Sequence, residues 1–143
     1  MNDHRDRDPD GRARQSRPRD ELGRPLPYGS VGVEPVSEEP LPPAETIAAA
    51  TALLEQGRPF SAHEVYEVRW KSCPQAERAM WQGLAQVCVA LTHQARGNHR
   101  GARRLLERAI LQLSAYRATA GPTYGLDLDD VISDARAEIL GVR

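Results

Sequence analysis

The chain has 143 residues, of which 27% are charged and 40% are hydrophobic, and its formal net charge is -1 at pH 7. This length favours one folded domain, and the balanced charge argues against a general attraction to nucleic acid or to a membrane surface. Cys73 and Cys88 lack C-x-x-C spacing, which argues against a zinc knuckle and a disulfide scaffold. No apolar run approaches the roughly 20 residues of a membrane span, and the N-terminus lacks the apolar core of a signal peptide. We therefore expect a cytoplasmic protein without a membrane segment.

The first 40 residues differ in composition from the rest of the chain. Arginine and aspartate alternate through residues 3–14, and prolines and glycines follow. Apolar side chains are too sparse to offset the entropy lost on ordering. We predict a disordered tail over residues 1–40, followed by a helical domain over residues 41–143. A solvated extension is the favoured interpretation of the tail, and an electrostatic tether for a partner is the alternative.

The first two helices are predicted from their stop signals. The first runs from position 43 or 44 to about Gln56, and Gly57 ends it as a C-cap. The second is predicted over residues 62–72. The Cys73-Pro74 step ends this helix because the residue before a proline avoids helical geometry.

The second helix carries a dense set of polar and aromatic side chains. Ser61 and Glu64 have the S-x-x-E spacing of a capping box. On a helical wheel, His63, Glu67 and Trp70 fall within about 60° of one another. A His–Glu pair at i,i+4 can form a salt bridge, and it can also supply two ligands of one metal ion.

The third helix is predicted from Pro74 or Gln75 to Arg96, and it is apolar on nearly every side, which is typical of a central, buried helix. Its polar exceptions Gln82, Gln86 and His93 lie within about 40° of one another. Unpaired buried polar groups cost roughly 1–3 kcal/mol each. We therefore expect this polar stripe to pair with the His–Glu pair of the second helix.

The last two helices are predicted over about residues 99–118 and 128–140, with Asn98 and Asp127 as their N-caps. No strand-like alternation of any length is present. Both of these last two helices have an amphipathic pattern with one apolar face.

Two stretches align at an offset of 40 residues. Residues 57–62 and 97–102 each read as a tight glycine turn followed by a small residue and a helix. This pattern is typical of an αα-hairpin, in which a small alanine lets two helices approach. The predicted fold is an all-α compact bundle of about five helices, built from two αα-hairpins plus a C-terminal helix.

Four motifs occur in order over roughly residues 48–118: His63-Glu64-x-x-Glu67-x-x-Trp70, Gln82-Gly83-Leu84-x-Gln86, Ala90-Leu91-x-His93 and Gly97-Asn98-x-x-Gly101-Ala102-x-x-Leu105-Leu106. Together they resemble the bacterial and archaeal family called domain of unknown function 309. The resemblance implies an all-helical bundle with H-E-x-x-E-x-x-W as its signature and no established activity. Ala85 stands where isoleucine is typical and Cys88 where a small alanine is usual, which are packing changes that leave the polar set intact.

The candidate site is the polar set of the second and third helices: His63, Glu64, Glu67, Trp70, Gln82, Gln86 and His93. The favoured interpretation is a buried, satisfied network that fixes helix packing in a non-enzymatic binding or self-association module. The alternative is a metal-dependent enzyme, of the hydrolase class, with His63, Glu67 and His93 around a divalent metal. An organic ligand or a catalytic pocket is a further alternative. The spacing matches neither the H-E-x-x-H of zincins nor the E-x-x-H of di-iron bundles.

The partner is predicted from the remaining features. Arginines at positions 100, 104 and 108 could grip a phosphate backbone, but Glu107 dilutes their field and the chain lacks the basic bias of nucleic-acid-binding proteins. Trp70 and Trp81 suit a core or an interface. We therefore favour a protein partner or a second copy of the chain over nucleic acid.

Overall fold

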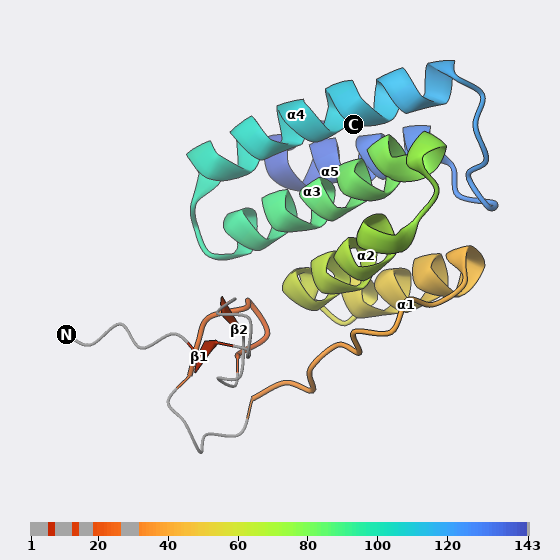
Figure 1. Cartoon of the computed structure of the whole chain (residues 1–143). Coiled ribbons are helices and arrows are strands. Elements are labelled where there is room, and N and C mark those ends of the chain that lie inside the picture. The colour runs from red at the N-terminus through yellow and green to blue at the C-terminus, as the bar shows by residue number, and fades with distance from the viewer. Residues whose placement is uncertain (1–5, 8–12, 15–18, 27–31, 143) are drawn as a thin grey trace.

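A computed structural model of the chain describes residues 6–7, 13–14, 19–26 and 32–142 (Figure 1). Within these residues the five α-helices are α1 Pro43–Glu55, α2 Pro59–Ser72, α3 Arg78–Ala95, α4 His99–Ala118 and α5 Leu128–Leu140. A 3-10 turn, η1 Gln75–Glu77, precedes α3, and the two-residue strands β1 Asp6–Arg7 and β2 Ala13–Arg14 pair antiparallel. The prediction of an all-α compact bundle is confirmed. None of the described helices is both long enough and apolar enough to cross a membrane.

The centre of the bundle is α3, which packs against α2, α4 and α5, while α1 packs against α2 (Figure 1). Met80, Trp81 and Leu84 of α3 are buried, and Leu106 and Leu113 of α4 meet them in one core cluster. Burying a large aliphatic side chain stabilises a fold by roughly 1.5–3 kcal/mol. The prediction of a central, buried third helix is therefore confirmed.

The two hairpin turns have the same hydrogen bonds at an offset of 40 residues. Gly57 and Gly97 have φ angles of +72° and +85°, a left-handed conformation that favours glycine. In each turn the glycine N–H donates to the carbonyl three residues back, and the next N–H donates to the carbonyl five residues back. After the turns, Ala62 and Ala102 are both 0% exposed. The predicted pair of αα-hairpins is thus present in the backbone itself.

The start of α2 differs from the prediction. The helix begins at Pro59, which lies in its first turn. Its N-cap residue, Arg58, makes no side-chain capping bond. The hydroxyl oxygen of Ser61 instead accepts from Arg58 Nη2 at 3.2 Å. The predicted capping box of Ser61 and Glu64 is therefore wrong. Proline begins the helix because its fixed φ suits the first helical position, where its missing N–H is not needed.

The helix α3 also starts later than predicted, after the 3-10 turn, whereas α4 and α5 have the predicted bounds. Both predicted N-caps are present. Asn98 Oδ1 accepts from Gly101 N at 3.1 Å, and Asp127 Oδ1 accepts from Asp129 N at 2.9 Å. Each such cap stabilises its helix by about 1 kcal/mol.

The described part of the N-terminal segment lies against the bundle. The Arg19 guanidinium lies over the Phe60 ring, 5.4 Å from its centroid, and the Leu22 carbonyl accepts from Arg96 Nε at 2.9 Å. About half of the predicted disordered tail, residues 1–40, lies outside the described residues. The tail and the boundary at residue 41 stay predictions.

Candidate functional site: a polar ladder on α2

The predicted His–Glu pair is the centre of an ion-pair ladder along α2. Glu67 uses one carboxylate oxygen for His63 Nε2, at 2.8 Å, and the other for Lys71 Nζ, at 2.9 Å. The three side chains follow one another at four-residue intervals, so they lie on one face of the helix. The hydrogen bond from His63, together with the Lys71 ammonium, lowers the pKa of Glu67 to about 2 against the opposing effect of burial. The structure thus brings His63 and Glu67 into contact, and Lys71 is a member that the sequence analysis missed.

The imidazole of His63 lies between two acceptors. Its Nε2 faces the Glu67 carboxylate, and its Nδ1 is 3.2 Å from the Phe60 carbonyl oxygen. The Phe60 ring packs beside it, with centroids 5.1 Å apart. Both ring nitrogens therefore face oxygen atoms of the same helix.

Glu64 lies one residue further along the same helix and is half-buried. Burial raises the pKa of its carboxyl group, and the positive charges of His63, Arg19 and Arg58 oppose that rise. Arg19 comes from the N-terminal segment, so the positive charge of this segment acts on the Glu64 carboxyl group of α2. Its place in the second turn of α2 explains why it does not reach back to cap the helix.

The polar stripe of α3 has other partners than those predicted. Gln82 Oε1 accepts from Gln112 Nε2 of α4 at 2.7 Å. His93 Nδ1 is 3.0 Å from Asn98 Nδ2, in the turn between α3 and α4. Gln86 Oε1 is buried and has no hydrogen-bond partner among the described residues. The stripe therefore faces α4 rather than the ladder on α2.

The predicted metal ligands do not come together. His63 and Glu67 are neighbours, but His93 pairs with the helix cap instead. In the described part of the chain, no group of three or more His, Cys, Asp or Glu side chains could hold a metal ion. Trp70 packs half-buried against the core, with the Arg78 guanidinium 5.5 Å from its ring centroid, and its buried Nε1 has no partner among the described residues. The metal-dependent alternative thus lacks its ligand set here.

A second polar cluster surrounds Glu77, which is 7% exposed. Its carboxylate accepts from Trp81 Nε1 at 3.2 Å and from the Tyr124 hydroxyl at 2.9 Å. The Trp81 ring lies between Tyr66 and Tyr124, with centroids 6.2 and 6.1 Å away. The hydrogen bond to Glu77 raises the pKa of Tyr124. This cluster fastens the α4–α5 loop to the start of α3, and the i,i+4 spacing of Glu77 and Trp81 was its one sequence signal.

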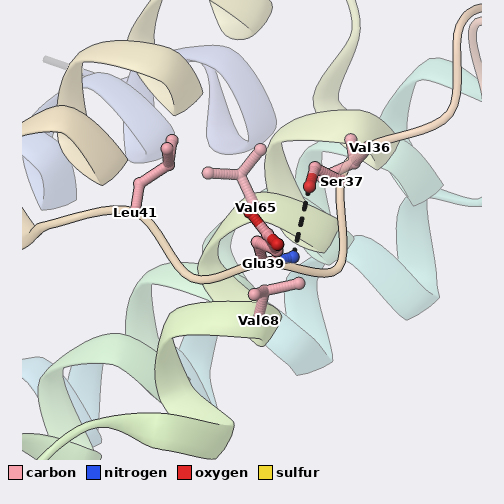
Figure 2. A pocket seen from close by; sticks show the side chains of 6 residues that line it. All are labelled: Val36, Ser37, Glu39, Leu41, Val65 and Val68. Atoms are coloured by element: carbon pink, nitrogen blue, oxygen red, sulfur yellow. Dashed lines mark hydrogen bonds between the residues drawn. The ribbon is translucent and has the colours of Figure 1, made fainter.

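A shallow apolar hollow lies elsewhere, between the segment that precedes α1 and the side of α2 (Figure 2). Its volume is about 200 Å³, and its lining residues are Val36, Ser37, Glu39, Leu41, Val65 and Val68. Within the lining, the Glu39 N–H donates to Ser37 Oγ at 3.2 Å. None of the predicted site residues lines it, so the hollow and the polar ladder are separate features.

Residues 47–105, from α1 into α4, match the family described as domain of unknown function (DUF309). The predicted family is confirmed, and its function is unknown. A Bacillus subtilis (strain 168) protein described as uncharacterized protein YpuF is 42% identical over 57 residues, which are 39% of this chain and 33% of that protein. The chain thus matches about a third of that relative's length. No solved structure matches the chain.

Proposed function

We propose that this domain is a non-enzymatic helical module that binds a protein partner through the outer face of α4, and that the ladder on α2 serves the fold. One observation carries the proposal. The outer face of α4 exposes four arginines that have no ion-pair partner among the described residues, and they are followed by Leu111, which is 72% exposed. We define this outer face as Arg100, Arg103, Arg104, Arg108 and Leu111.

Folding does not account for these arginines. Arg100 and Arg103 lie in the first turns of α4, where positive charge opposes the helix dipole. The first turn contains no acidic residue to offset them. Exposed ion pairs contribute little to stability in any case, so a fold gains nothing from concentrating arginine here.

Binding does account for them. Arginine is enriched at protein interfaces, where its planar guanidinium pairs with carboxylates. Leu111 supplies an apolar contact among the charges. The geometry suits an acidic protein surface, since complementary charge guides association and fixes orientation. Glu107 lies on the same exposed face, which disfavours a nucleic-acid backbone.

The ladder supports the structural side of the proposal. Both carboxylate oxygens of Glu67 and both ring nitrogens of His63 are already engaged within α2. A group that is to bind an outside ligand would have to break these contacts first. The ladder therefore suits a role in stabilising α2 itself.

The test uses the tagged full chain as bait in nuclease-treated lysate of cells that express it naturally, beside three variants. We expect Arg104→Glu to reduce capture of the partner about tenfold, the effect of a 1.4 kcal/mol loss of binding. The matched control Arg24→Glu, which reverses an exposed charge in the N-terminal segment, should leave capture unchanged, as should His63→Ala. Full capture by Arg104→Glu, or capture that occurs only when the nuclease is left out, would overturn the proposal.

A further inference from the structure

A row of exposed carboxylates on α5 has the same spacing as the arginines of α4. Asp130, Asp134 and Glu138 form this acidic row, at i, i+4 and i+8, and none has an ion-pair partner among the described residues. The neighbouring Asp129 is already paired, 2.6 Å from Arg117 Nη1 of α4, so it is not part of the row. The basic row consists of Arg100, Arg104 and Arg108. Because a helix rises 1.5 Å per residue, each row extends about 12 Å along its helix.

We propose that the partner is a second copy of this chain, with the acidic row of one copy lying along the basic row of the other. This inference rests on the proposed function and names its partner. At a constant offset of 30 residues in the parallel direction, all three charges of one row meet opposite charges of the other. The equal spacing makes each of the three contacts attractive at the same register.

Exposed apolar side chains extend the match beyond the charges. Leu111 follows the basic row by three residues, and Leu140 and Val142, 40% and 53% exposed, follow the acidic row by two and four. In the parallel register these side chains lie at the same end of the contact. An antiparallel register would instead place Leu111 near the start of α5, where Asp127 caps the helix. The apolar residues thus favour the parallel arrangement.

The directions of the two helices within one copy fit this arrangement. Figure 1 shows α4 running away from the α3–α4 turn and α5 returning in the opposite direction. A two-fold axis perpendicular to these helices reverses each of them in the second copy. It therefore sets α4 of one copy parallel to α5 of the other and produces the same contact twice. In the proposed closed dimer, this symmetry pairs the basic row of each copy with the acidic row of the other.

The expected association is reversible and sensitive to salt. Exposed ion pairs are individually weak, and salt screens them. We expect a dissociation constant on the order of 10 µM at low ionic strength. Raising the salt concentration from about 0.05 M to about 0.5 M should weaken the dimer more than about tenfold, because the Debye length falls severalfold.

Sedimentation velocity of the untagged full chain, at concentrations up to about 200 µM, tests the inference. We expect Arg104→Glu and Asp134→Arg each to weaken the dimer at least about tenfold. The combined variant should return to within about threefold of the natural chain, because the swapped charges attract again. Arg24→Glu is the matched control and should dimerise normally. Circular dichroism of each variant confirms that these exposed substitutions leave the helices intact.

Three results would overturn the inference: a natural chain that stays monomeric at every concentration, a dimer that neither reversal weakens, or a combined variant that fails to recover. None of these would by itself overturn the proposed function. If the bait is monomeric but still captures another protein through Arg104, the proposed protein-binding function stands and the second copy is rejected as its partner. Loss of capture only in His63→Ala would instead reject the proposed function.

Discussion

Replacing Glu67 with glutamine removes the charge at the centre of the α2 ladder and keeps the shape of the side chain. The pKa of Glu67 is about 2 in the folded chain, against an ordinary value of 4.5. At 1.36 kcal/mol per pKa unit, a shift of this size would correspond to roughly 3 kcal/mol of stability. The Glu67 side chain is 33% exposed, however, so solvent screening reduces its contribution. We expect Glu67→Gln to lower the free energy of unfolding by about 1 kcal/mol at pH 7.

The pH dependence of this loss has a definite sign. Because the pKa of Glu67 is lowered by folding, its stabilisation is fully present above pH 4.5 and is lost as the pH falls toward about 2. The difference in unfolding free energy between the natural chain and Glu67→Gln should therefore shrink across this range. Urea unfolding followed by circular dichroism, at pH 7 and at about pH 2.5, measures it.

The control for this experiment is Glu55→Gln, an exposed carboxylate in the last turn of α1 without an ion-pair partner among the described residues. We expect its effect to stay within about 0.5 kcal/mol at both pH values. The reasoning is refuted if Glu67→Gln costs the same at both pH values, or if it costs no more than the control does at pH 7.

Three further substitutions test the packing, the caps and the N-terminal segment. In Gly83→Ala the new Cβ would lie 2.8 Å from Cδ2 of the fully buried Leu113. Overpacking should cost about 1–3 kcal/mol of stability, which exceeds the gain of about 1 kcal/mol from the higher helix propensity of alanine. A higher free energy of unfolding in urea would contradict this expectation. Asn98→Ala removes the cap of α4 and should lower the unfolding free energy by about 1 kcal/mol in the same assay. Gly23→Ala would place a Cβ 2.2 Å from Phe60 Cγ at a φ of +76°. It should release residues 19–26 to limited trypsin digestion while the melting temperature of the bundle stays unchanged, and unaltered digestion would count against the contact.

The helix boundaries that the sequence predicted well are those with local signals. Asn98 and Asp127 cap helices with their own side chains, and Gly57 supplies a left-handed residue at a turn. Each signal acts within a few residues, so it can be read without the fold. At the start of α2, Pro59 and Ser61 offered competing signals two residues apart. The structure follows the proline, since the Ser61 hydroxyl is engaged by an arginine side chain instead.

The candidate site was predictable only where it stays within one helix. The i,i+4 pair of His63 and Glu67 forms because helical geometry alone brings the two side chains together. A helical wheel places Gln82 and His93 on one stripe of α3, but it does not say which neighbouring helix that stripe faces. That choice depends on the whole bundle, in which Gly83 lets α4 approach closely on this side. The bond from Tyr124 to Glu77 spans 47 residues of sequence and has no local signal at all.

The α2 ladder stabilises the fold and the outer face of α4 mediates association, and one paired measurement separates these two roles. His63→Ala and Arg104→Glu are each followed by thermal unfolding and by sedimentation at low salt. We predict that His63→Ala lowers the melting temperature by about 4 °C and keeps the dimer, whereas Arg104→Glu keeps the melting temperature and loses the dimer. The opposite pattern, with association lost in His63→Ala and kept in Arg104→Glu, would contradict the central claim.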